Sequence, residues 1–211
     1  MSGYHRPIMV DEVLEGLDIR AGGVYFDGTA GGGGHSFAIL AADPTVRLVA
    51  TDKDGDAIRE VTERLSPFAG RYKLYRTDFK NFASVLDDAG VEKLDGYLLD
   101  LGISSHQIDT RERGFAYMSD DAPLDMRMDD RAQLTAKEVV NGYSEEALLR
   151  ILREYGEESY ASSIVRNIVR ERAKGEIATC GALRSVIEES VPATYRYHAC
   201  ARKTFQATRI E

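Results

Sequence analysis

Four consecutive glycines, Gly31 to Gly34, lie between an apolar run and a helical pattern in the stretch YFDGTAGGGGHSFAIL, residues 25–40. A glycine-rich turn that follows a first parallel strand and opens a helix lets backbone N–H groups approach a bound cofactor. Asp52 follows Gly34 by 18 positions, close to the ~20 residues expected for a carboxylate that binds ribose hydroxyls. This spacing predicts a site for a cofactor that contains a nucleoside.

Polar residues also end the other predicted strands. Asp27 ends the first strand, the word TDF at residues 77–79 ends the third, and Asp100 ends the fourth. The carboxylate after the second strand could bind both ribose hydroxyls of an adenosyl group, and Phe79 could form an apolar wall for its adenine. No Lys-Ser/Thr pair follows the glycines, which excludes a P-loop, and the dinucleotide fingerprint fits poorly because its third position is Ser36. The whole set favours S-adenosylmethionine.

The elements that must position these residues alternate through the first hundred residues. Short β-branched or aromatic runs alternate with helical apolar spacing, which predicts β-α-β units and a parallel sheet. The predicted strands cover residues 24–27, 47–52, 72–78 and 94–102, and the predicted helices between them cover residues 35–42, 56–65 and 82–90. The fold class is therefore α/β.

After Gly102 this alternation stops. Residues 103–133, the long loop, are polar, rich in Asp and without a period, and they are numerous enough for a functional loop. Helical patterns follow, the first from an N-cap at Ser144 to Gly156, and two more at residues 158–175 and 180–191. We expect a cofactor-binding core at residues 1–106, a loop and helical domain at 107–203, and the start of a return to the core at 204–211.

Composition is that of an ordinary globular chain, with 211 residues, 43% hydrophobic and 29% charged. No apolar run approaches the ~18 residues of a membrane span, and the N-terminus MSGYHRPIMV lacks a signal-peptide core. We therefore expect a cytoplasmic protein that does not bind a membrane. Cys180 and Cys200 lack the spacing of metal ligands, so no metal is expected.

Charge is segregated along the chain. Residues 1–149 carry 16 Lys or Arg against 27 Asp or Glu, whereas residues 150–211 carry 11 against 8. The segment from 190 to 210 has no acidic residue, and its basic residues Arg196, Arg202, Lys203 and Arg209 are interleaved with the aromatic residues Tyr195, Tyr197 and Phe205. Such a mixture suits phosphate contact and base stacking in a nucleic acid. A solvated basic stretch that follows an acidic domain is an equal alternative.

Four longer sequence motifs are more distinctive than the residue spacings described above. They are DGTAGGGGHS at residues 27–36, LLDLGISSHQID at 98–109, RGFAYMSDDAPLDMRMD at 113–129 and ARKTFQATRIE at 201–211. Together they closely resemble the MraW family of bacterial methyltransferases, which act on a cytosine N4 of small-subunit ribosomal RNA. The resemblance runs from HRPIMVDEVLEGL, at residues 5–17, to the last residue.

This resemblance implies a Rossmann-like, doubly wound methyltransferase domain that is interrupted by a helical domain. It implies methylation, dependent on S-adenosylmethionine, of one cytosine in the decoding region of 16S ribosomal RNA, with the small ribosomal subunit as partner. Carried over position by position, the family's cofactor contacts fall on Gly33, Gly34, His35, Asp52, Phe79, Asp100 and Gln107. From the residues alone, His35 would be a helix-capping or turn residue.

The chemistry of methyl transfer indicates candidate catalytic residues. A nucleophile has to be aligned behind the methyl group, so positioning supplies most of the rate. Because the lone pair of the cytosine amine is delocalised into the ring, acceptors have to hold its hydrogens, and we predict Asp100 or the adjacent Ser104 and Ser105. Related amino-methyltransferases of DNA carry the motif Asp/Asn-Pro-Pro-aromatic at this place, where this chain has Asp100-Leu-Gly-Ile. The catalytic roles of the residues in that motif therefore cannot be carried over to this chain.

The long loop carries the candidates for base binding. A target base has to be unstacked into the pocket, and Phe115 and Tyr117 could form its aromatic platform. The alternative is that both residues anchor the loop to the helical core. Asp125, Arg127 and Asp129 form either a substrate clamp or, as we favour, an internal salt-bridged turn. The predicted substrate contacts are Phe115, Tyr117, Arg196, Arg202 and Lys203.

The chain is shorter than the family it resembles, whose members continue beyond FQATRIE with a further helix and the strands that complete the sheet. A four-stranded half-sheet leaves an unpaired edge and uncovered apolar surface, which favours a homodimer. Two other functions stay open. One is a catalytically inactive RNA-binding or assembly module, and the other is an NAD-dependent oxidoreductase, which would use the same glycine turn but leaves LLDLGISS unexplained.

Overall fold

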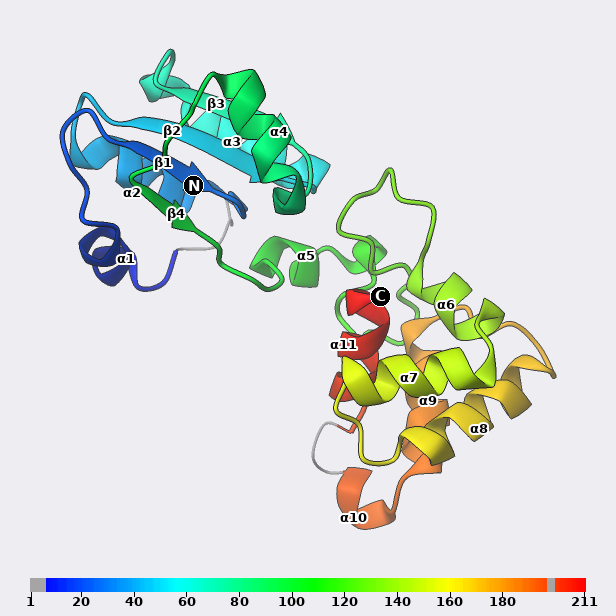
Figure 1. Cartoon of the computed structure of the whole chain (residues 1–211). Coiled ribbons are helices and arrows are strands. Elements are labelled where there is room, and N and C mark those ends of the chain that lie inside the picture. Colours follow the sequence, from blue (N-terminus) through cyan, green and yellow to red (C-terminus); the bar gives the residue numbers. More distant parts are fainter. Residues whose placement is uncertain (1–6, 197–199) are drawn as a thin grey trace. The chain divides into compact units, whose positions relative to one another are not determined.

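The computed structural model describes residues 7–196 and 200–211, and the chain divides into two compact units (Figure 1). The core unit runs to His106 and also contains Met128–Asp130. The helical unit contains Gln107–Arg127 and Arg131–Glu211. The chain therefore passes from one unit to the other three times.

The core unit holds a four-stranded parallel sheet in the order β3-β2-β1-β4. Its strands are β1 (Val24–Asp27), β2 (Arg47–Asp52), β3 (Tyr72–Arg76) and β4 (Gly96–Leu98), and its helices are α1 (Val10–Leu17), α2 (Gly34–Ala42), α3 (Gly55–Arg64) and α4 (Phe82–Ala89), with the 3-10 turns η1 (Ser66–Phe68) and η2 (Phe79–Asn81). The predicted α/β class is confirmed. β3 ends earlier than predicted because Asp78 accepts a hydrogen bond from the backbone of Lys80 and caps η2.

Apolar clusters on both faces of the sheet hold the helices in place. Because successive strand residues point to opposite faces, Tyr25 belongs to the cluster with Leu40 of α2 and Val61 of α3, whereas Phe26 belongs to the cluster with Val85 of α4. Each large side chain that is fully buried contributes about 1.5–3 kcal/mol to stability. Helices on both faces leave the carboxyl ends of the strands to the connecting turns.

β4 is an edge strand of this sheet and pairs with β1. Tyr97 on the strand and Leu101 just beyond it are each 69% exposed. An edge that carries exposed apolar side chains can pair with another chain. Within the described residues, β4 is thus an edge strand of the kind that a half-sheet was expected to leave.

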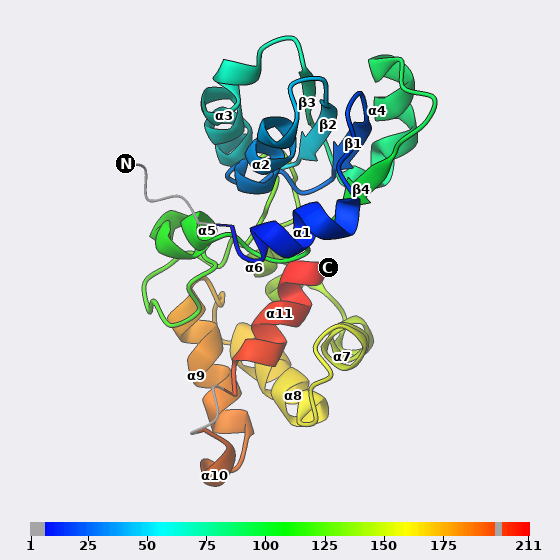
Figure 2. The same ribbon diagram turned by 90° about the vertical axis from the view of Figure 1, so that its left-hand side faces the viewer.

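The helical unit is built from amphipathic helices around one apolar core. Its elements are η3 (Arg111–Arg113), α6 (Ala136–Gly142), α7 (Glu145–Glu154), α8 (Ala161–Arg172), α9 (Cys180–Ser190), α10 (Ala193–Arg196) and α11 (Arg202–Ile210). Figure 2 shows α8 beside α7 and α9, and α11 beside α7. The predicted N-cap of α7 is confirmed, because the Ser144 hydroxyl accepts from the Ala147 N–H at 3.2 Å. Residues 204–211, expected to begin the return to the core, lie largely in α11, which packs on α7 and α6.

The long loop is irregular for most of its length, as predicted. It also forms two short helical turns, α5 (Ser105–Asp109) and η3, and the first passage between the units lies within α5. Within residues 7–196 and 200–211, no helix is long and apolar enough to cross a membrane, and no three His, Cys, Asp or Glu residues are grouped as metal ligands.

Candidate functional site

The glycine turn joins the carboxyl end of β1 to α2. Gly33 is the N-cap of α2 with φ of +74°, a left-handed conformation that L side chains rarely adopt. A Cβ on Gly34 would lie only 2.6 Å from the Cγ atom of Pro7. Part of the requirement for glycine, which the sequence pattern attributes to a cofactor, therefore comes from the protein's own packing.

Asp52 holds the glycine turn against the end of β2. Its Oδ2 accepts from the Gly31 N–H at 2.8 Å, and its Oδ1 accepts from the Asp54 N–H at 2.9 Å. Burial raises the pKa of Asp52, and the N–H donors of Asp54 and Gly31 offset part of this effect. Because a carboxylate oxygen can accept more than one hydrogen bond, Asp52 keeps acceptor capacity for ribose hydroxyls.

Asp27 also holds the glycine turn, through hydrogen bonds that its side chain accepts. It is buried, its Oδ1 accepts from the Thr29 N–H at 3.1 Å, and its Oδ2 accepts from the Ser36 hydroxyl at 2.6 Å. Burial raises the pKa of Asp27, although both donors act in the opposite direction. The sequence pattern counted Asp27 among the features that favour a cofactor, and its contacts give it a structural task.

Asp100 lies beyond the carboxyl end of β4 and is exposed. Its N–H donates to the Thr29 Oγ1 at 2.7 Å, and the Gly28 N–H donates to the Leu98 carbonyl at 3.0 Å. These bonds tie the end of β4 to the start of the glycine turn. Because the strands are parallel and β1 lies between β2 and β4, Asp52 and Asp100 belong to one edge of the sheet and flank the turn.

Phe79 and His35 complete this edge. Phe79 is half-buried, begins η2 after β3, and packs beside the cluster that contains Phe26 and Val49. The Nδ1 atom of His35 is buried and has no hydrogen-bond partner within the described residues. An unsatisfied buried polar atom costs about 1–3 kcal/mol, so His35 is suited to a ligand contact. The acceptors, the apolar ring and this nitrogen together fit an adenosyl cofactor.

The predicted cofactor contacts are thus distributed unevenly between the units. The core unit contains Gly33, Gly34, His35, Asp52, Phe79 and Asp100. Gln107 is buried and is the first residue of the helical unit, directly after the first passage. Ser104 and Ser105, the alternative acceptors for the cytosine amine, are half-buried just before that passage.

Phe115 requires a correction. Its side chain is 3% exposed, so its ring cannot serve as a stacking platform in this structure. Tyr117 is half-buried, and its ring centroid lies 5.6 Å from that of Phe205. Of the two aromatic candidates, only Tyr117 keeps exposed surface.

The long loop is anchored at the first turn of α9. The Cys180 thiol donates to the Gly114 carbonyl at 3.4 Å, and burial raises the pKa of that thiol to about 11. Arg184 donates to the Met118 carbonyl at 3.0 Å and also pairs with Asp120. Sequence reasoning missed these anchors, because the partners lie 64 to 66 residues apart and no local pattern marks them.

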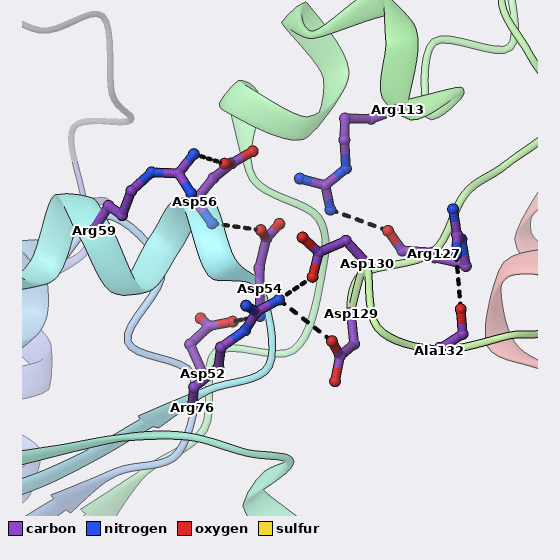
Figure 3. Close-up of polar contacts among 10 residues, drawn as sticks. All are labelled: Asp52, Asp54, Asp56, Arg59, Arg76, Arg113, Arg127, Asp129, Asp130 and Ala132. Atoms are coloured by element: carbon purple, nitrogen blue, oxygen red, sulfur yellow. Dashed lines mark hydrogen bonds and ion pairs between the residues drawn. The ribbon is translucent and has the colours of Figure 1, made fainter.

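Asp125 and Arg127 form the predicted salt-bridged turn. The Arg127 guanidinium donates to both Asp125 oxygens, at 2.9 and 2.7 Å. It also donates to the Ala132 carbonyl at 2.7 Å (Figure 3). Asp129, the third residue expected in this turn, pairs with Arg76 at 3.4 Å in the core unit. The interpretation of a salt-bridged turn therefore holds for Asp125 and Arg127.

The basic segment is only partly open to solvent. Arg196 and Arg202 are exposed, whereas the Lys203 ammonium donates to the Glu157 carbonyl at 2.8 Å. The aromatic residues are engaged as well, since the Tyr195 ring lies 4.8 Å from that of Tyr160 and Phe205 is buried. Tyr197 lies outside the described residues.

Comparison with known proteins gives a consistent set of relatives. A sequence model of the MraW methylase family matches residues 2–211. The ribosomal RNA small subunit methyltransferase H 2 of Agathobacter rectalis is 47% identical over 214 residues, which cover 100% of this chain and 68% of that protein. The ribosomal RNA small subunit methyltransferases H of Symbiobacterium thermophilum and Clostridioides difficile are 47% and 44% identical, with 100% of this chain and 67% and 68% of those proteins covered. The chain spans about two thirds of the length of these relatives.

Proposed function

Because the chain belongs to the MraW methylase family, we propose that it transfers a methyl group from S-adenosylmethionine to small-subunit ribosomal RNA. More specifically, we propose N4 of a cytidine in the decoding region of 16S ribosomal RNA as the acceptor. Family membership overturns the alternative of an NAD-dependent oxidoreductase. The observation that carries the proposal is the pair of carboxylates, Asp52 and Asp100, on either side of a glycine turn that also presents the unsatisfied His35.

The cofactor would supply an activated methyl group, and the core unit would hold it. Asp52 would accept from the ribose hydroxyls while it keeps its bonds to the glycine turn, and Phe79 would lie against the adenine. His35 would contact the cofactor through its unsatisfied Nδ1. Gly33, Gly34 and Gln107 are further proposed contacts, the two glycines because their backbone can be approached closely.

The reaction needs an acceptor for the amine of the target base. We propose that the exposed Asp100 carboxylate holds an amino hydrogen and orients the nitrogen toward the methyl group, with Ser104 and Ser105 as the adjacent hydroxyl acceptors. Asp100 suits this task because its backbone is fixed by Thr29 while its side chain remains open to solvent. A positioned acceptor acts by alignment, which is the main source of rate in this transfer.

The RNA contacts are proposed for the helical unit. Arg196 and Arg202 are exposed and can bind phosphates, whose charge dominates the affinity of most nucleic-acid complexes. Lys203 adds positive charge although its ammonium is already bonded, and Tyr117 offers a half-exposed ring. A ribosomal substrate would place the activity in the cytoplasm. A homodimer through the β4 edge stays a prediction, and light scattering that detects only monomer would contradict it.

Transfer of tritium from labelled S-adenosylmethionine to small subunits that lack the modification tests the proposal. Nuclease digestion and mass spectrometry of the product would identify N4-methylcytidine. We expect turnover by the wild-type chain and none by Asp100→Ala, with Asp87→Ala, an exposed residue of α4, as the matched control. Wild-type turnover by Asp100→Ala would remove the proposed acceptor. Cofactor binding without any transfer by the wild-type chain would favour the inactive RNA-binding module.

A further inference from the structure

A three-residue segment inside the long loop belongs to the core unit, as do residues 103–106 at the start of the loop. Met128–Asp130 is grouped with the sheet, whereas the residues before and after it, to Arg127 and from Arg131, are grouped with the helices. Two of the three passages between the units therefore adjoin this segment. Whatever holds Met128–Asp130 also restrains the loop on both sides of it.

Arg76 holds two residues of this segment. It is the last residue of β3, and its guanidinium donates to the Asp129 carboxylate at 3.4 Å and pairs with Asp130 (Figure 3). The same guanidinium lies over Gly55, where a Cβ would be 2.8 Å from the Arg76 Cζ. Gly55 is the first residue of α3, so Arg76 lies between the loop segment and the helix that follows Asp52.

Charge explains why an arginine is needed here. Figure 3 shows the carboxylates of Asp52, Asp54, Asp129 and Asp130 gathered around the Arg76 guanidinium. The Arg76 side chain is 30% exposed and that of Asp129 is 25% exposed, so their pair is less screened by water than an exposed one. Without the cation, two loop carboxylates would face two carboxylates of the cofactor edge, and like charges at short range repel.

We infer that Arg76 is a positioning residue: it holds Met128–Asp130 beside the cofactor edge, and methyl transfer to RNA requires this contact although cofactor binding does not. The inference rests on the proposed function. Asp52 binds the glycine turn through its own hydrogen bonds, which do not involve Arg76. The segment directly follows the Asp125–Arg127 turn and lies beside the cofactor edge, where the methyl group has to meet its acceptor, so its release would disturb that side of the site.

A set of charge-neutral variants tests this role. Arg76→Gln, the pair Asp129→Asn with Asp130→Asn, and all three changes together are compared with Lys73→Gln, which removes an exposed cation from the same strand. Three quantities are measured for each protein. They are the single-turnover rate on small subunits, the dissociation constant for S-adenosylmethionine, and the rate of tryptic cleavage after Arg127 and Arg131.

Misplacement of a supporting element can slow a reaction by about 10- to 100-fold, and we expect a loss of this size for Arg76→Gln and for the Asn pair. The triple variant should be no slower than either, because residues that act through one contact are not additive. Cofactor affinity should stay within about two-fold, and tryptic cleavage should accelerate. Arg76→Lys, which keeps the charge, should recover part of the rate.

Each other outcome decides against the inference. An unchanged rate and unchanged tryptic cleavage in Arg76→Gln would show that the contact is not needed. If Arg76→Gln lost cofactor affinity as well as rate, Arg76 would be part of the cofactor site. If the triple variant lost rate by the product of the separate losses, Arg76 and the two aspartates would act independently and not through one contact. If the wild-type chain transfers no methyl group, the proposed function fails, whereas tryptic cleavage still shows whether Arg76 holds the segment.

Discussion

The glycine turn and the long loop contain glycines with nearly the same left-handed φ, +74° at Gly33 and +72° at Gly114. Their surroundings differ. A Cβ on Gly33 would lie 3.3 Å from the side-chain Cδ of Arg64, which can move, whereas a Cβ on Gly114 would lie 2.2 Å from the backbone oxygen of Pro123. One glycine therefore serves backbone conformation, and the other serves conformation and close packing of the backbone.

The two regions also differ in the charges that hold them. Two carboxylates that accept backbone and hydroxyl hydrogen bonds, Asp27 and Asp52, fix the glycine turn. Arginines fix the long loop, with Arg127 inside it and Arg184 on α9. An acceptor-lined turn is suited to the hydroxyls of a small cofactor, whereas a loop held by ion pairs can be released when one partner is lost.

The largest effect is expected when Asp52 is changed to Ala. The variant loses the proposed acceptor for the ribose hydroxyls and the bond to the Gly31 N–H, and each hydrogen bond to a charged group contributes about 1.5–3 kcal/mol. We expect S-adenosylmethionine to bind at least about 100-fold more weakly in calorimetric titration. Asp87→Ala serves as the control. Unchanged affinity in Asp52→Ala would mean that this carboxylate only supports the turn.

The next largest effect separates the two glycines. Gly114→Ala should lower the free energy of unfolding by about 2–4 kcal/mol, because a left-handed backbone and a backbone clash act together. Gly33→Ala should cost about 1–2 kcal/mol through its φ alone. Urea unfolding measures both. Gly175→Ala, with no atom within 4 Å of its Cβ, is the control, and equal losses at the two positions would contradict the comparison.

The fold and the candidate site could be predicted from the sequence only in part. The order of strands and helices and the chemistry at the glycine turn follow from local periodicity and from Asp52, which lies one β-α unit beyond the glycines. The burial of Phe115 could not be predicted, because composition does not distinguish a stacking aromatic residue from a buried one. Arg76 carried no signal either, since its partners lie 53 and 54 residues further along the chain.

The smallest effect is a difference in pH dependence between the regions. Burial holds the pKa of Asp27 above its usual value of about 3.9, so the folded state binds the proton more tightly and the free energy of unfolding falls as pH rises from about 4. Asp125 is also desolvated, which acts to raise its pKa, but its bonds to Arg127 bring the pKa below the usual value. Its contribution to stability is complete above about pH 4 and disappears as pH falls further.

Urea unfolding of Asp27→Asn and Asp125→Asn between about pH 2.5 and 7 separates these opposite signs. Relative to the wild-type chain, Asp27→Asn should gain stability as pH rises above about 4, because the amide keeps an acceptor oxygen without a buried charge. Asp125→Asn should be less stable above about pH 4 and approach the wild-type value below it, because only the ionised carboxylate pairs with Arg127. Each change should be about 1 kcal/mol. If the difference in free energy of unfolding between variant and wild type changed with pH in the same direction for both substitutions, the two regions would not differ in the electrostatics that hold them.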